Sequence, residues 1–448
     1  MPRRNQKNKL ALGSSLPFYY GWIVVLVAFL TMAIAVNART SFSLLFPPIL
    51  SEFKWSRGVT AGVFSIGFIV STLLTPCIGL MMDKLGPRVV LPFGAVLTSA
   101  GLIGSTISSE SWHFYFTLGV LLIGGSVFMS YFGHTLFLPN WFDRKRGFAM
   151  GLAFAGAGLG AILLLPLIQN IILSDGWRQA AFVLALIIIL IVIPINLIFQ
   201  RHRPEELGLE VDGDKISNAN TKLSDSVNLN TRIVDQYWYD KEWTLSTAMR
   251  TGKFWWLIVS FSTALYAWYA VQVHQTKYLI DVGVSAEFAA FALGLVGLTG
   301  VIGQISLGAF SDKFGREIAW TIALMGFILT YACLFLIKFF PSMALIYLMV
   351  GLQGFIGYGL ASVFGSVPAD LFSGKHYGRI FGVIGGFSNI GAAAGPWITG
   401  IFYDYNKNYN SAFLSAIILC LISILAMWLV GPRKVVLVMG KTQKINLR

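Results

Sequence analysis

The sequence predicts an all-α polytopic membrane protein with twelve transmembrane helices in two pseudo-symmetric six-helix bundles. Three observations predict this fold: twelve long apolar runs, a low content of charged residues, and a repeat that relates the two halves of the chain. Of the 448 residues, 56% are hydrophobic and only 12% are charged, whereas a soluble domain carries about 25% charged residues. A surface with so little charge must face lipid. The composition therefore indicates that the protein is embedded in a lipid bilayer.

Each apolar run is long enough to cross a hydrocarbon core, which needs about 20 residues of helix. In order, the runs cover residues 18–46, 58–81, 88–108, 112–139, 147–173, 179–199, 253–280, 287–310, 317–339, 343–368, 378–402 and 410–431. A long polar stretch separates the sixth run from the seventh. We therefore expect an N-terminal bundle over residues 1–200, a cytoplasmic linker over 201–250, a C-terminal bundle over 251–431 and a cytoplasmic tail over 432–448.

The basic residues indicate how the chain is oriented. The net charge is +13, but the charges occur in short clusters between apolar runs, so no continuous basic surface follows a phosphate backbone and we expect no nucleic-acid partner. With both termini inside, 26 of the 33 Lys and Arg residues fall on the cytoplasmic side, which is the bias that orients membrane proteins. The other seven are Arg39, Lys54, Arg57, Arg178, Lys277, Lys338 and Lys407. This pattern predicts a multi-pass protein of the cytoplasmic (inner) membrane.

An internal repeat relates the two halves. The segment Gly79–Arg88 follows the second run, and the similar segment Gly308–Arg316 follows the eighth. Asp83 and Asp312 occupy matching places, 229 residues apart, and a second pair of similar segments after the fourth and tenth runs is offset by 231 residues. Parallel repeats of this kind are a transporter plan, with the substrate site near the bilayer midplane between the halves.

The segment Gly79–Arg88 reads Gly-x-x-x-Asp-Lys-x-Gly-x-Arg and resembles the signature between the second and third helices of the major facilitator superfamily. Gly308–Arg316 is a recognisable second copy. The resemblance implies the major facilitator fold and alternating access for a small solute. It also implies an inner gate latched by charge pairs, here Asp83, Arg88, Asp312 and Arg316. The alternative is that these residues only cap helices and fix the topology.

More locally, the chain is similar to the branch that holds monocarboxylate transporters and bacterial oxalate/formate exchangers. The matching pieces are Tyr20 to Trp22, Phe42 to Pro48, Trp55 to Arg57, Asn140 to Gly147, Gly176 to Arg178, Arg203 to Leu209 and His274 to Gly283. This similarity implies symport or antiport of a small organic anion, such as a monocarboxylate, with a proton or a counter-anion as partner.

One difference from the sequences of this branch leaves substrates other than organic anions as alternatives. Transporters of this branch often carry an Arg in the eighth helix, whereas Gln304 stands at the matching position here, and no Lys or Arg occurs between Lys277 and Lys313. A neutral or amphipathic solute is therefore an alternative substrate. A transporter-like membrane sensor, which binds a ligand without moving it, is a third hypothesis.

An ionisable side chain inside a membrane helix is costly, so each one is a candidate site residue. Arg39 follows Asn37 near the outer third of the first run, where a guanidinium can bind a carboxylate with two hydrogen bonds; the alternative is that it snorkels to the headgroups. At the outer end of the seventh run, Gln272, His274 and Lys277 are expected to form a cationic vestibule with Arg39. The alternative there is an interfacial lysine and a histidine bound by helix carbonyls.

Uncharged polar groups supply further candidates. Tyr131 and His134 are three residues apart towards the inner side of the fourth run, and His134 is a candidate polar group of the inner half. The alternative is a packing histidine that is satisfied by hydrogen bonds. The amides of Gln304 and Asn389 can bind substrate or join helices. No acidic residue falls at the centre of a run, so proton coupling would need His134, His274 or a proton carried by the substrate.

The motifs of other protein classes are missing from the sequence. It contains no phosphate-binding loop, no paired metal-ligand motif and no set of Ser, His and Asp at a shared depth. Its three cysteines are scattered through apolar runs, which does not indicate a disulfide framework. We therefore expect no enzyme activity, no cofactor and no metal, and we expect a monomer.

The predicted topology can be checked by cysteine labelling in a variant without the three native cysteines. Single cysteines at Ser226 in the linker and near each terminus should react with a membrane-impermeant maleimide only after permeabilisation, because all three positions are expected in the cytoplasm. A linker cysteine that reacts in intact cells while the termini do not would contradict the arrangement.

Overall fold

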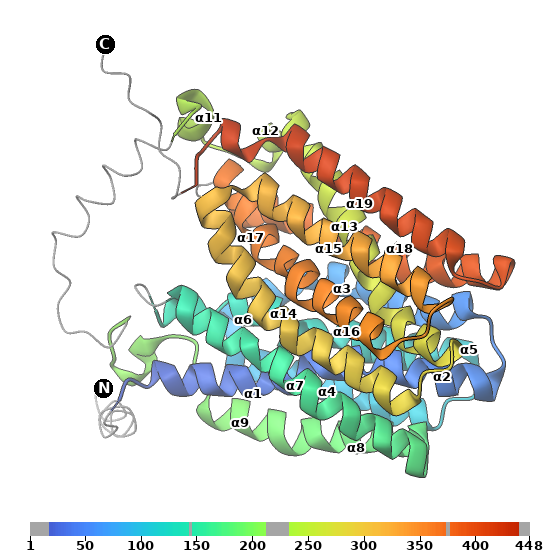
Figure 1. Ribbon diagram of the computed structural model, residues 1–448. Coiled ribbons are helices and arrows are strands. Elements are labelled where there is room, and N and C mark those ends of the chain that lie inside the picture. Colours follow the sequence, from blue (N-terminus) through green and yellow to red (C-terminus); the bar gives the residue numbers. More distant parts are fainter. Residues whose placement is uncertain (1–17, 143–145, 212–232, 373–376, 439–448) are drawn as a thin grey trace, which may run out of the picture. The chain divides into compact units, whose positions relative to one another are not determined.

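The computed structural model describes residues 18–142, 146–211, 233–372 and 377–438, which are almost entirely helical (Figure 1). The chain divides into two compact units, Met1–Phe42 with Val70–Ser217 and Ser43–Ile69 with Asn218–Arg448. This division differs from the sequence repeat, because residues 43–69 of the first half pack within the second unit. The bounds of the linker and tail stay predictions.

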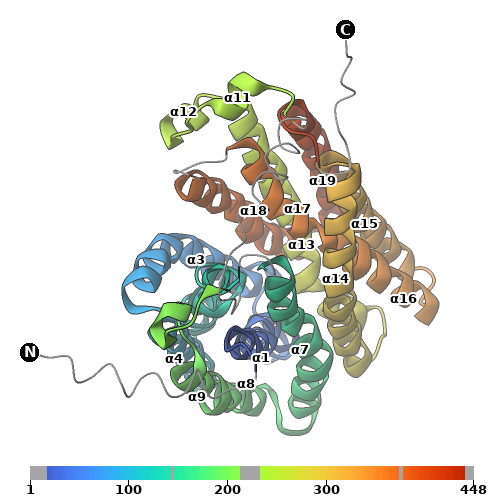
Figure 2. The same ribbon diagram turned by 90° about the vertical axis from the view of Figure 1, so that its left-hand side faces the viewer.

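The first unit is built around α1, which packs along α7 (Figure 2). Its elements are α1 (Gly21–Thr40), α4 (Pro87–Thr106), α5 (Ser111–Phe114), η1 (Tyr115–Gly124), η2 (Gly125–Met129), α6 (Tyr131–Thr135), η3 (Leu138–Asn140), α7 (Arg146–Asp175), α8 (Trp177–Ile187), η4 (Ile188–Val192), α9 (Ile193–Phe199) and η5 (Pro204–Leu207). Two helices, α2 (Phe42–Phe53) and α3 (Arg57–Leu85), contain the boundaries between the units.

The second unit is built around α13, which packs along α18 and α19 (Figure 1). Its elements are α11 (Gln236–Asp240), α12 (Leu245–Met249), α13 (Gly252–Asp281), α14 (Ala286–Phe314), α15 (Arg316–Ile337), α16 (Met343–Gly351), η7 (Leu352–Ile356), η8 (Gly357–Gly359), α17 (Leu360–Leu371), α18 (Tyr377–Asn406), α19 (Asn410–Val430) and η9 (Pro432–Lys434). An antiparallel bridge joins Ile233 to Val436.

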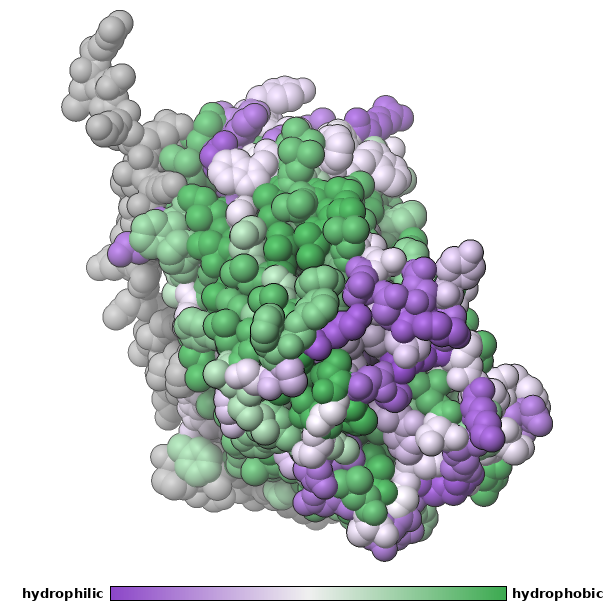
Figure 3. Space-filling view, turned by 45° about the vertical axis from the view of Figure 1, so that its right-hand side comes forward, coloured by the Kyte–Doolittle hydropathy of each residue, from purple (hydrophilic) through white to green (hydrophobic). Residues whose placement is uncertain are grey.

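The predicted fold class is confirmed. Within the described ranges, eleven helical segments are long and apolar enough to cross a bilayer, and the 30-residue helix α18 covers the remaining expected run. The first segment is longer than the sequence predicted, because it continues through Pro47 and Pro48 to Phe53. Large apolar side chains such as Leu73 and Leu190 are exposed (70% and 68%), and Figure 3 shows broad hydrophobic areas of this kind on one face.

Glycines bring one helix pair of each unit into backbone contact. A Cβ atom at Gly160 of α7 would lie 2.1 Å from the carbonyl oxygen of Ala33 in α1, and one at Gly391 of α18 would lie 1.8 Å from that of Ser262 in α13. The full set is Gly156 and Gly160 on α7 with Gly391 and Gly395 on α18. Two small residues four apart are a known device for close helix approach in lipid, and here both copies of the repeat use it.

The repeated signature forms the same turn in both units. Gly86 between α3 and α4 has φ 71°, and Gly315 between α14 and α15 has φ 121°. Only glycine adopts such values without strain. The glycine in each copy of the signature is therefore required by the turn itself.

The fourth and tenth spans are interrupted in the same manner. In the fourth, the π-helical segment η1 passes into the 3₁₀ segment η2, and in the tenth η7 passes into η8. Irregular turns inside a helix often mark functional hinges, and matching interruptions in the two halves of a transporter point towards the substrate path.

The close helix contacts yield a stability prediction. Gly160→Ala and Gly391→Ala should each lower the free energy of unfolding by about 1–3 kcal/mol, because the added methyl meets a backbone oxygen and forces the helices apart. Gly151→Ala in α7 and Gly385→Ala in α18 are matched controls, since a Cβ there has no neighbour within 4 Å. Thermal unfolding in detergent measures all four, and equal midpoints for both classes would contradict the contact.

Candidate functional site

An open cavity of about 540 Å³ lies in the second unit, where the junction between α2 and α3 meets the ends of α13 and α18. Its charged lining residues are Lys54, Arg57, Lys277, Asp404 and Lys407, and Trp55 and Tyr403 add aromatic surface. We call this space the Lys277 cavity. Of the residues proposed from the sequence, it contains Lys277.

Arg57 is the buried centre of the polar cluster beside this cavity, with only 9% of its surface exposed. Its Nη2 donates to Asp281 and its Nη1 to the Tyr409 hydroxyl, each at 2.6 Å. The Tyr403 ring centroid lies 3.5 Å from the guanidinium carbon, which adds a cation–π contact. Asp281 also accepts a hydrogen bond from Lys277, one turn earlier on α13. A single carboxylate thus joins two cations, and Arg57 ties α3 to α13 and to the start of α19.

The cluster continues to His274 through a defined chain of hydrogen bonds. His274 Nε2 lies 2.9 Å from the carbonyl oxygen of Pro396, which can only accept, so Nε2 donates. His274 Nδ1 then accepts from the Tyr409 hydroxyl at 3.1 Å, while that hydroxyl accepts from Arg57. Burial raises the pKa of Tyr409, which keeps the hydroxyl protonated. Both ring nitrogens of His274 are therefore engaged inside the protein, in its neutral form.

Asp404 caps the first turn of α3 from the end of α18. Its two carboxylate oxygens accept hydrogen bonds from the backbone N–H groups of Arg57 at 2.8 Å and Gly58 at 2.6 Å. The first N–H groups of a helix lack partners within it and carry partial positive charge. A Cβ at Gly58 would lie 2.9 Å from this carboxylate, so the absence of a side chain gives Asp404 its access.

Arg39 and Asn37 occupy the last turn and a half of α1. Because the first apolar segment runs from Gly21 to Phe53, Arg39 is nearer its middle than the outer third expected from the sequence. Asn37 is buried, and its amide nitrogen donates to the carbonyl oxygens of Ala33 and Ala157, both at 2.8 Å. This amide joins α1 to α7, whereas Arg39 is only half-buried.

Tyr131 and His134 lie directly after the interruption of the fourth span. The Tyr131 ring packs edge-on against Phe154, with centroids 5.0 Å apart. His134 is fully buried, and its Nδ1 donates to the carbonyl oxygen of Ser130 at 3.0 Å. Within the described ranges its Nε2 has no hydrogen-bond partner, and neither polar atom of Gln353 has one near the matching interruption. Both interruptions thus carry a buried group with unused hydrogen-bonding capacity.

The remaining amides differ in their surroundings. Gln272 is buried on α13, and its backbone carbonyl accepts from Ser43 at 2.8 Å. Gln304 is half-buried on α14, and its backbone carbonyl accepts a hydrogen bond from the Ser362 hydroxyl at 2.6 Å. Asn389 is half-buried on α18. None of these three residues lines the Lys277 cavity, and their binding roles stay predictions.

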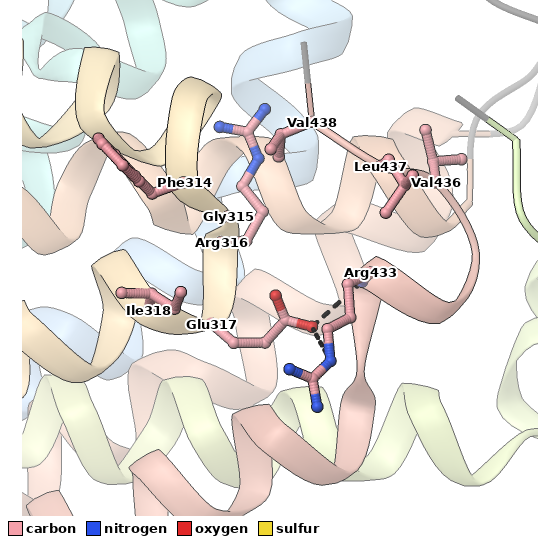
Figure 4. A pocket seen from close by; sticks show the side chains of 9 residues that line it. All are labelled: Phe314, Gly315, Arg316, Glu317, Ile318, Arg433, Val436, Leu437 and Val438. Carbon is pink, nitrogen blue, oxygen red and sulfur yellow. Dashed lines mark hydrogen bonds and ion pairs between the residues drawn. The ribbon is translucent and has the colours of Figure 1, made fainter. Parts of the chain in front are cut away.

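The proposed gate residues of the second unit form one network. Arg316 donates to Asp312 at 2.6 Å on the preceding turn and to Asp370 of α17 at 2.9 Å. The adjacent Glu317 is buried and accepts from the backbone N–H of Arg433 at 3.1 Å. Figure 4 shows the Glu317 carboxylate directed at Arg433, with the Arg316 guanidinium pointing away from both. The network fastens α14, α15 and α17 together.

Of the two matching gate residues in the first unit, only the side chain of Arg88 can be described. Arg88 is exposed and donates through Nε to the backbone carbonyl of Leu197. The side chain of Asp83 lies outside the described residues. The gating role of all four residues stays a prediction.

Sequence reasoning missed the cluster around Arg57. Arg57 belongs to a matched family segment, and Asp281 and Asp404 are acidic residues at helix ends, but none was proposed as a site residue. Basic residues on the expected outer side are rare, and that rarity was the available signal. The pairing itself joins residues 224 positions apart, which no local pattern reveals.

Two units of membrane-length helices with matching interrupted spans are the plan of a polytopic membrane transporter. The family model described as Major Facilitator Superfamily matches residues 27–368 and 351–443, and the chain belongs to this family, which is one of transporters and not of enzymes.

The proteins similar to this chain include two monocarboxylate transporters. The chain is 26% identical over 404 residues to monocarboxylate transporter 13 of Bos taurus, covering 89% of this chain and 86% of the relative. It is 26% identical over 413 residues to monocarboxylate transporter 12 of Rattus norvegicus, covering 88% and 82%. A solved structure of a bacterial homolog of the human lysosomal transporter Spinster, inward-facing and occupied, shares the fold with a TM-score of 0.65 at 15% identity, covering 92% of this chain and 97% of that one.

The hydrogen-bond chain yields a second stability prediction. Tyr409→Phe should lower the free energy of unfolding by about 1–3 kcal/mol, because it leaves a donor of Arg57 and an acceptor of His274 buried without a partner. Tyr405→Phe is the matched control, since Tyr405 is 88% exposed. Thermal unfolding compares the two, and a Tyr409→Phe midpoint equal to that of the control would refute the chain.

Proposed function

We propose that this protein is a secondary active transporter that moves a small organic anion, of the monocarboxylate class, across the cytoplasmic membrane by alternating access. The observation that carries the proposal is Arg39, a cation in the middle of the 33-residue apolar segment Gly21–Phe53. A guanidinium stays charged at any physiological pH, and a charge at such depth is retained where it serves a function. A substrate carboxylate complements it with two parallel hydrogen bonds.

Two further findings support the proposal. The curated relatives bear the name monocarboxylate transporter, which agrees with a carboxylate substrate. The paired interruptions η1–η2 and η7–η8 place irregular helical turns at matching positions of the two halves, and discontinuous helices of this kind commonly form the substrate sites of transporters. A proton or a counter-anion is the expected coupling partner, and both termini are expected in the cytoplasm.

A neutral or amphipathic substrate is the second candidate, and one observation favours it. Gln304 on α14 is uncharged where this branch often has an Arg, so a carboxylate would meet one cation fewer. An amide can hold a neutral polar group equally well, because it both donates and accepts hydrogen bonds.

Transport by the purified protein in proteoliposomes separates the two candidates. Uptake of labelled monocarboxylates, such as lactate and pyruvate, should saturate and exceed uptake of neutral solutes. Arg39→Ala should lower kcat/KM for these anions by about 10- to 100-fold, as expected for the loss of a hydrogen bond between charged groups.

Arg178→Ala is the matched control, because Arg178 is an exposed arginine at the start of α8. It should leave uptake close to that of the unaltered protein. Equal uptake by the unaltered protein and the Arg39 variant, or saturable uptake of neutral solutes alone, would refute the anion assignment.

A further inference from the structure

Basic residues on the expected outer side are few, yet four of the seven line the Lys277 cavity. They are Lys54, Arg57, Lys277 and Lys407. They come from three places in the chain: the junction between α2 and α3, the last turn of α13 and the end of α18. Because the positive-inside bias depletes cations on this side, their convergence on one cavity of the second unit calls for a function.

The nearby carboxylates do not neutralise this lining. Asp281 accepts from Arg57 and Lys277, and both oxygens of Asp404 are bound to backbone N–H groups. Four cations facing two carboxylates leave an excess of two positive charges. In the described part of the chain, the side-chain ammonium groups of Lys54 and Lys407 have no hydrogen-bonding or ion-pairing partner.

The backbone at both lysines is unusual. Lys54 has φ 54° and Lys407 has φ 56°, and among the described residues no other non-glycine residue has a positive φ. Each directly follows a helix, α2 or α18, at a position where glycine is the common choice. A non-glycine residue in this conformation costs about 1–2 kcal/mol. The chain thus bears strain at two separate places to set a lysine at the rim of the same cavity.

We propose that the Lys277 cavity is an outer loading site, which concentrates a carboxylate anion before it enters the transport path. The inference rests on the proposed function and adds a second anion site, distinct from Arg39. A cleft lined by one sign of charge raises the local concentration of its counter-ion, and about 540 Å³ accommodates a small solute. Because Lys54 and Lys407 are exposed, binding is weak and falls as added salt screens the charges.

Quenching of tryptophan fluorescence by iodide tests the site without relying on transport. Trp55 lines the cavity, and the difference between each protein and the same protein carrying Trp55→Phe isolates its emission. In the double variant Lys54→Gln/Lys407→Gln, the iodide quenching constant of this component should fall at least about twofold, as expected when steering charges are removed. Quenching by neutral acrylamide should not change.

Lys338→Gln is the matched control, because Lys338 is another exposed lysine expected on the outer side and does not line the cavity. It should leave the iodide quenching of Trp55 unchanged. Equal iodide quenching in the double variant and this control overturns the loading site, whether or not the protein transports lactate. Reduced quenching in the double variant supports the site even if lactate uptake fails, in which case only the proposed function is lost.

If the protein transports lactate, the KM for lactate uptake provides a second test of the loading site. The double variant should raise KM for lactate at low ionic strength while kcat stays unchanged, because it weakens capture and leaves the Arg39 site intact. The difference in KM should shrink as salt is added. A KM equal to that of Lys338→Gln at low ionic strength would overturn the loading role.

Discussion

Helices in lipid cannot rely on water to drive them together, so their association depends on how closely their backbones approach. In each unit this approach is set by glycines placed against a carbonyl oxygen: Gly160 over Ala33 and Gly391 over Ser262. The central helices α1 and α13 are thereby held tightly against α7 and α18. Polar groups such as Asn37 can reach across these contacts because the distance is short and defined.

Much of the fold could be predicted from the sequence, because each span is a local property. Twenty apolar residues need a helix that satisfies its own backbone, and the repeated glycine signature specifies the same turn twice. Span ends were less certain: Pro47 and Pro48, which usually end a helix, lie inside α2. The packing of residues 43–69 with the second unit depends on contacts between distant parts of the chain, which hydropathy does not record.

The site was less predictable, because a polar residue in an apolar run shows that a partner is needed and not which partner. His274 and Asn37 illustrate this: their partners are carbonyl oxygens of Pro396 and Ala157, and carbonyls are available at every position. Arg57 shows the opposite case. It lies at a span end, where charges are ordinary, and only the fold reveals that it is buried between Asp281 and two tyrosines.

The assignment of residues 43–69 to the second unit has a consequence for how the halves depend on each other. A cut in the polar stretch between the halves would leave an N-terminal fragment carrying Arg57, whose partners Asp281 and Tyr409 belong to the other fragment. The repeated halves are thus not self-sufficient pieces. Without the C-terminal half, the Arg57 guanidinium would lack the carboxylate and the hydroxyl that bind it in the whole protein.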